Sequence, residues 1–158
     1  MPPRKKLDET DLNILAELYE NSRITNKELS AKTKIAPSTC LERVKKLQSL
    51  GVIKAFSLDI DYAAIGGNIE AMISVKLGKH SSEVIKNFSK DLVEHPEVLR
   101  VFYMSGNYDF LLHITITDTL QLRNFILRAV TSRSEVTHIE TTLIFEQLSS
   151  NILPLRAN

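Results

Sequence analysis

Hydrophobic and polar residues follow two different rhythms along the chain, and the change comes near Gly66-Gly67. Before this pair, apolar residues recur at the three- and four-residue spacing of amphipathic helices. After it, residues 69–77 and 110–116 alternate apolar and polar positions, which is typical of half-buried strands. The pattern therefore predicts a helical N-terminal region followed by a region that mixes strands and helices.

Three helices are predicted in the first sixty residues, because each has a recognisable start. Asp8 suits the N-cap of the first helix, and residues 25–28 form a capping box for the second. Pro37 suits the first position of the third helix, and Gly51 suits a left-handed end to it. Residues 52–58 are then expected to form a strand. A short helix, a tight turn and a longer helix make the helix-turn-helix pattern.

The outer face of the third helix is the strongest functional candidate, because the second helix of such a pair enters the major groove of DNA. The stretch from Lys32 to Lys54 carries six basic residues against the lone acid Glu42. This charge fits an electrostatic footprint for phosphate, although a solvated helix face would look the same. The predicted contacts are Ser38, Thr39, Glu42 and Arg43 in the groove, with Lys45 and Lys46 on phosphate.

Beyond Gly66-Gly67 the predicted order of elements is β-α-β-β-α-β, a ferredoxin-like sheet with both helices on one face. The expected strands cover residues 69–77, 98–104, 110–116 and 136–145, and the expected helices are 81–93 and one capped by Asp118. The uncovered face should carry apolar side chains that need a partner, with Phe102, Ile144 and Val136 as candidates.

Together these patterns predict an α+β protein. We expect a helix-turn-helix domain over residues 1–53, a hinge strand and linker over 54–67, and a ferredoxin-like domain over 68–158.

The segment Ser105-Gly106-Asn107-Tyr108-Asp109 joins two of the expected strands. Glycine and asparagine are common in turns, so a plain turn is one interpretation. In the other, exposed backbone groups hold a small zwitterion. Asp109 would then either pair with its ammonium or only shape the loop.

Composition limits which classes of protein and site remain possible. A single cysteine, Cys40, excludes an intramolecular disulfide and a cysteine-based zinc site. The four histidines show no metal-ligand spacing, and no catalytic triad or glycine-rich phosphate loop is present. No apolar run is long enough for a membrane span, and no secretory signal follows the basic N-terminus. We therefore expect a cytoplasmic protein without metal or cofactor, and not an enzyme.

Several motifs together resemble the leucine-responsive/asparagine-regulator (Lrp/AsnC) family of transcription regulators, over essentially the whole chain. They are Leu7-Asp8 with Asp11 and Ile14-Leu15, then residues 23–29 (RITNKEL), 37–47 (PSTCLERVKKL), 51–53 (GVI) and 106–112 (GNYDFLL). One departure is Ala36, where the family usually has a capping serine.

The resemblance implies a winged helix-turn-helix domain that binds double-stranded DNA, and a second domain that oligomerises and binds an effector. It implies homodimers, which we expect to gather into octamers. It also implies a free amino acid bound between subunits, and the neighbouring residues favour leucine or methionine. The implied effector residues are Met104, Ser105, Gly106, Asn107, Tyr108 and Asp109, with Thr141 on the last strand.

Two other functions are compatible with this two-domain plan. One is a tetrapyrrole (siroheme-type) decarboxylase, for which His113 and Arg100 are the nearest candidate residues. The other is an amino-acid-sensing module that does not bind DNA. The intact basic third helix favours the regulator over both.

Overall fold

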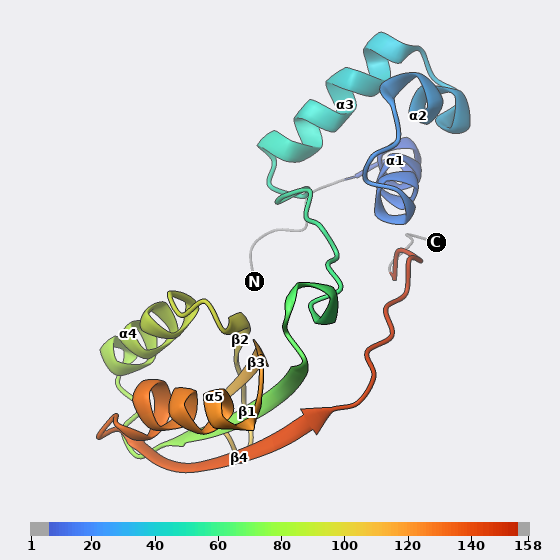
Figure 1. Cartoon of the computed structure of the whole chain (residues 1–158). Coiled ribbons are helices and arrows are strands. Elements are labelled where there is room, and N and C mark those ends of the chain that lie inside the picture. Colours follow the sequence, from blue (N-terminus) through green and yellow to red (C-terminus); the bar gives the residue numbers. More distant parts are fainter. Residues whose placement is uncertain (1–6, 155–158) are drawn as a thin grey trace. The chain divides into compact units, whose positions relative to one another are not determined.

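The computed structural model describes residues 7–154, which form two compact units. Residues 7–59 and 148–154 belong to the first unit, and residues 60–147 form the second. Figure 1 shows the three helices of the first unit, α1 (Glu9–Glu20), α2 (Asn26–Thr33) and α3 (Pro37–Ser49). Along residues 7–154, no helix combines the length and apolar character needed to cross a membrane.

The predicted caps account for where these helices begin. Asp8 and Asp11 form a capping box at α1, and Thr25 and Glu28 form another at α2. Pro37 occupies the first turn of α3, but the N-cap residue Ala36 has no side chain that accepts a hydrogen bond. These predictions from the sequence are confirmed.

The turns and core of the first unit follow from its apolar residues. Lys34 ends α2 in the left-handed conformation, with φ 56°, and Gly51 follows α3 with φ 64°. The buried side chains at the centre are Ile14, Leu29, Cys40 and Leu47. Burial raises the pKa of the Cys40 thiol, so this cysteine behaves as a small core residue.

The expected strand at residues 52–58 is wrong. These residues have no regular secondary structure, and a short 3₁₀ turn, Ala63–Ile65, follows them. Phe56, Leu58 and Ile60 alternate along the segment, and their side chains are exposed. A strand needs a neighbouring strand for its backbone hydrogen bonds, and no strand within residues 7–154 pairs with the segment.

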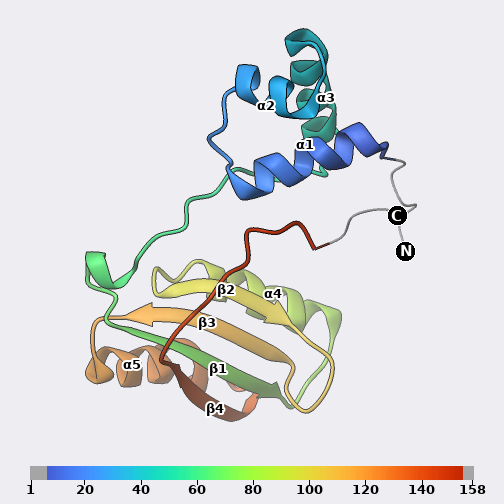
Figure 2. The same cartoon turned by 90° about the vertical axis from the view of Figure 1, so that its right-hand side faces the viewer.

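The second unit is the predicted ferredoxin-like domain. Its elements are β1 (Ile69–Leu77), α4 (Ser82–Val93), β2 (Val98–Tyr103), β3 (Phe110–Ile116), α5 (Thr119–Phe125) and β4 (Val136–Ile144). The strands pair antiparallel in the order β2-β3-β1-β4, as Figure 2 shows face-on. Figure 1 shows α4 and α5 on the same side of this sheet. A π-helical turn, Ile126–Thr131, continues α5 and was not predicted.

Alternation along the strands divides the sheet into two faces. The helix-covered face holds the main core, which includes Ile73 and Val75 of β1 and Leu112 of β3. On the other face Phe102 is 42% exposed, as expected for a surface without a cover. Of the three candidates, Val136 lies under the helices, because it pairs with Leu77 and packs against the core.

The missing cap at Ala36 generates a stability prediction. Ala36→Ser should add a hydroxyl that accepts a hydrogen bond from the first turn of α3, which is worth about 1 kcal/mol. The melting temperature of the first unit should rise by about 4–8 °C. The matched control is Thr25→Ala, which removes the cap of α2 and should lower it similarly. An unchanged melting temperature in Ala36→Ser, with the control behaving as expected, would contradict this account of the α3 start.

Candidate DNA-binding surface and effector loop

The exposed face of α3 gathers most of the predicted DNA contacts. Ser38 and Thr39 lie exposed in the first turn of the helix, and Glu42, Lys45 and Lys46 are exposed further along it. Cys40 and Leu47 are buried on the opposite face against the other helices. The helix therefore presents hydroxyls at its N-terminal end and ammonium groups towards its C-terminal end.

Arg43 differs from these neighbours, because two carboxylates already hold its guanidinium. Its Nη1 donates to Asp8 Oδ2 at 2.6 Å and to Asp11 Oδ1 at 2.8 Å. The Asp11 side chain is only 4% exposed. These bonds tie α3 to the capping box of α1, so in this structure Arg43 fixes the position of the helix. Its predicted contact with a base stays a prediction.

The turn between α2 and α3 is fixed by a further contact that the sequence did not reveal. The side-chain amide of Asn26, at the start of α2, donates to the Pro37 carbonyl at 2.9 Å. Leu41 was also missed: it is 45% exposed on α3, among the polar contacts. An apolar side chain at such a place can contact a thymine methyl group.

The loop from Met104 to Asp109 joins β2 to β3, and Asp109 determines its shape. The Met104 N–H donates to the Asp109 carbonyl at 2.8 Å, and the Asp109 N–H donates to the Val75 carbonyl at 2.9 Å. Asp109 Oδ2 accepts from the Leu77 N–H at 2.8 Å, and Oδ1 lies 3.1 Å from His80 Nδ1. The carboxylate thus holds the loop on the end of β1, which is the loop-shaping role that the sequence left open.

The outer part of the loop has free backbone donors. Gly106 has φ 120°, and a side chain there would meet no atom within 4 Å. Among residues 7–154, the N–H groups of Ser105, Gly106 and Asn107 have no hydrogen-bond acceptor. Successive free N–H groups beside a left-handed glycine are suited to an anion such as a carboxylate.

Tyr108 and Thr141 occupy different surroundings. The Tyr108 hydroxyl donates to Glu140 Oε2 at 2.7 Å, which raises the pKa of Tyr108, and its ring stacks on His138 at 6.0 Å between centroids. Glu140 pairs with Ser74, whereas Thr141 pairs with Ile73 of the core. The side chain of Thr141 therefore lies on the helix side of the sheet, opposite the Tyr108–Glu140 pair. Glu140 and His80 escaped the sequence analysis because they lie far from the loop in the chain.

The residues proposed for the alternative enzyme lie side by side on neighbouring strands of the sheet. Arg100 pairs with His113 across β2 and β3 and is exposed. His113 is 5% exposed and lies 2.8 Å from Glu70 through Nε2. The histidine is thus buried in a pair on the sheet. No group of three metal-ligating side chains occurs among residues 7–154.

A helix-turn-helix unit joined to a ferredoxin-like unit is typical of DNA-binding transcription regulators that respond to small ligands. Residues 7–54 match the family model for winged helix-turn-helix DNA-binding, and residues 70–153 match the Lrp/AsnC ligand binding domain. The chain belongs to the Lrp/AsnC family of transcription regulators.

Individual relatives agree with this assignment. The chain is 41% identical to the HTH-type transcriptional regulator AldR of Mycolicibacterium smegmatis, over 91% of this chain and 84% of that protein. It is 33% identical to the transcriptional regulator AzlB of Bacillus subtilis, over 87% and 88%. A Neisseria meningitidis transcriptional regulator solved as a complex with L-Met has a TM-score of 0.84 at 29% identity, over 94% and 97% of the two chains.

The Arg43 cluster generates a pH prediction. The Arg43 guanidinium and the Asp11 backbone N–H hold the pKa of Asp8 below its ordinary 3.8. A lowered pKa stabilises the fold above the ordinary value, and the effect is lost as pH falls through the lowered value. Asp8→Asn keeps a good N-cap but loses the charge. It should therefore be less stable than wild type at pH 7, and the difference should shrink below about pH 4.

Urea unfolding of both proteins at pH 7 and pH 3 measures this difference. Asp118→Asn is the comparison in the other unit, because hydrogen bonds from the Gln121 backbone and Thr117, and no arginine, lower the pKa of Asp118. Its gap from wild type should also shrink on acidification, and it measures what capping contributes without an ion pair. A gap between wild type and Asp8→Asn that stays constant over this range would show that the charge on Asp8 does not stabilise the fold.

Proposed function

We propose that the chain binds operator DNA through the exposed face of α3 and that a free amino acid, bound at the Met104–Asp109 loop, controls this binding. The DNA-binding part of this proposal rests on the two faces of α3. One face is buried, and the other exposes Ser38 and Thr39 at the start of the helix and Lys45 and Lys46 towards its end. We assign residues 1–53 to DNA binding, 54–67 to the hinge and 68–158 to effector binding and assembly, of which residues 148–154 cluster with the first unit.

On DNA, the hydroxyls of Ser38 and Thr39 contact phosphate oxygen or base edges at the start of the recognition helix. Glu42 accepts from a cytosine amino group, and Lys45 and Lys46 neutralise phosphates. Arg43 has further N–H donors beyond those used by Asp8 and Asp11, and these contact a guanine.

The effector is an amino acid whose carboxylate accepts from the free N–H groups of Ser105, Gly106 and Asn107. Met104 and Tyr108 line the remainder of the site, whereas Thr141 lies on the helix side of the sheet and does not join them within this chain. Asp109 holds the loop in the receptive shape through Leu77. Methionine and leucine are the favoured ligands, and the L-Met complex of the Neisseria meningitidis regulator supports the first.

The active species is a homodimer that assembles further into an octamer. A single recognition helix contacts few base pairs, whereas a two-fold dimer reads two half-sites. Two surfaces of this chain lack a cover: the alternating Phe56, Leu58 and Ile60, and the open face of the sheet around Phe102. A second copy would supply strands for the first surface and apolar contacts for the second.

Lys45→Ala tests the DNA-binding surface. Loss of one phosphate contact should weaken binding to specific and random DNA alike and should flatten the salt dependence by roughly one unit. Lys90→Ala removes the same charge from α4 in the other unit and serves as the control. Fluorescence anisotropy with labelled duplexes at several salt concentrations measures both effects. A salt slope equal to that of wild type would remove Lys45 from the interface.

Arg43→Ala tests base reading in the same assay. A base contact predicts a loss of about 1–3 kcal/mol that is confined to one base pair of the operator. Equal losses on specific and random duplexes would leave Arg43 only its structural role beside Asp8 and Asp11.

Gly106→Trp tests the effector loop. A tryptophan at φ 120° is strained and covers the free N–H groups, so stabilisation by amino acids should be lost. Thermal shift with all twenty amino acids, followed by sedimentation velocity with those that bind, measures binding and assembly. Lys90→Ala should respond like wild type. Equal stabilisation of Gly106→Trp would place the site elsewhere, and a species of only 18 kDa at micromolar concentration would contradict the dimer.

A further inference from the structure

Leu41 is an apolar side chain on the otherwise polar outer surface of α3. It is 45% exposed, whereas Cys40 and Leu47 of the same helix are buried. Within residues 7–154, Val44 packs against the core of the first unit and Leu41 does not. The fold therefore uses three apolar side chains of α3 and leaves the fourth in solvent. Single exposed leucines are common on protein surfaces, so the position of Leu41 on the helix decides what it can do.

Helix geometry places Leu41 between two of the proposed DNA contacts. Ser38 lies three residues before it and Lys45 four residues after it, so the three side chains share one stripe of α3. Both of these neighbours are exposed. Arg43, two residues further on, is turned by about 200° around the helix axis, and its guanidinium binds the capping box of α1. Leu41 therefore points away from α1, on the side of Ser38 and Lys45.

The major groove of DNA offers such an apolar side chain one favourable partner. If Ser38 and Lys45 contact DNA, Leu41 between them lies against the edges of the bases. Those edges carry hydrogen-bond donors and acceptors, and only thymine adds an apolar group, the C5-methyl. Covering a donor or an acceptor with leucine removes its water without giving it a partner, which is costly. Covering a methyl group with leucine is favourable.

We propose that Leu41 is a specificity-determining residue that selects thymine through the C5-methyl group, a role that rests on the DNA binding proposed above. In each half-site one thymine methyl packs against the end of the Leu41 side chain. The selection has two parts, because the methyl contact favours thymine and the uncovered polar edges of the other bases count against them. Phosphate contacts such as that of Lys45 carry no sequence information, so Leu41 supplies a preference that they lack.

Replacement of thymine by deoxyuridine tests the contact directly, because the two differ only in the C5-methyl group. The probe is a labelled duplex that the full-length wild-type chain has selected from a random pool. Each thymine is replaced in turn, and the affinity is measured by fluorescence anisotropy. At one thymine or more in each half-site, the replacement should weaken wild-type binding about 3- to 5-fold, the effect of losing one buried methyl group.

The same replacements with variants of Leu41 assign the methyl contact to this residue. Leu41→Ala should bind the thymine and deoxyuridine duplexes equally at that position, whereas Leu41→Met keeps an apolar side chain of similar size and should retain the difference. Leu120→Ala is the matched control, because it truncates a leucine that is 59% exposed on α5 of the other unit. It should show the same loss as wild type. Leu41→Ala should also melt as wild type does and bind random duplexes as tightly.

Three results would overturn the proposal. In the first, no deoxyuridine replacement weakens wild-type binding. In the second, Leu41→Ala retains the full loss at the sensitive thymine, so another residue contacts the methyl group. In the third, Leu41→Ala weakens binding to selected and random duplexes equally, so Leu41 only supports the surface. Each of these leaves the DNA-binding function standing, whereas a wild-type chain that selects and binds no duplex would overturn both.

Discussion

The alternation of buried and open positions along β1 is the constraint on which the second unit depends. This strand lies between β3 and β4, so burying Ala71, Ile73, Val75 and Leu77 sets the register of both neighbours. At its C-terminal end the Leu77 N–H and the Val75 carbonyl bind Asp109 and fix the effector loop. At its N-terminal end the close approach of Gly67 to Thr115 fixes the hinge. A one-residue shift in the register of β1 would therefore displace the Met104–Asp109 loop and the hinge at Gly67 together.

In the first unit, the residues that cap the start of α1 also position α3. Asp8 and Asp11 cap α1 and at the same time bind Arg43. Cys40 and Leu47 thus pack α3 against the core of the first unit, and the ion pairs of Arg43 with Asp8 and Asp11 hold the helix to α1. This arrangement leaves the hydroxyls and lysines of α3 exposed, as the proposed DNA contact requires, and it explains why Arg43 on the same helix faces the protein.

Local rules made much of the fold predictable from the sequence. Asp8, Thr25, Pro37 and Gly51 act through neighbours within four residues, and their roles were confirmed. Period-two alternation predicted β1 and β3 for the same reason. The segment at 52–58 has a similar alternation, but the described part of the chain offers it no neighbouring strand, so the pattern alone predicted a strand wrongly. The π-helical turn at Ile126–Thr131 has no distinct sequence pattern.

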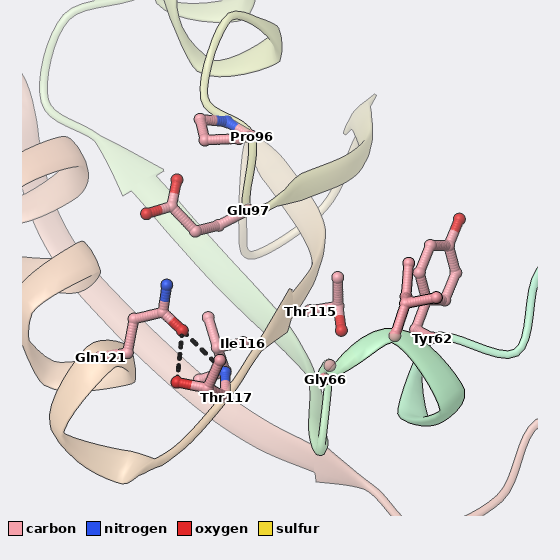
Figure 3. A pocket seen from close by; sticks show the side chains of 10 residues that line it. Tyr62, Gly66, Pro96, Glu97, Thr115, Ile116, Thr117 and Gln121 are labelled. Carbon is pink, nitrogen blue, oxygen red and sulfur yellow. Dashed lines mark hydrogen bonds between the residues drawn. The ribbon is translucent and has the colours of Figure 1, made fainter.

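The sites were less predictable, because their contacts cross long stretches of chain. The exposed positions of α3 followed from helical periodicity, but the pairing of Arg43 with Asp8 spans 35 residues. In the loop, glycine and asparagine marked the turn, whereas the bonds from Asp109 to Leu77 and from Tyr108 to Glu140 depend on strand register. The pocket lined by Tyr62, Glu97 and Gln121 (Figure 3) could not be predicted from the sequence. Its lining residues come from separate elements that adjoin only after the sheet has formed.

We propose that an amino acid bound in the second unit changes the affinity of the first unit for DNA, and reciprocal titration tests this coupling most directly. The affinity for operator DNA would be measured with and without saturating L-methionine, and the affinity for L-methionine with and without saturating operator. Linkage requires the two ratios to be equal, and a regulator of this kind should show a factor of roughly 5–150. Tight binding of both ligands with both ratios equal to one would contradict the account.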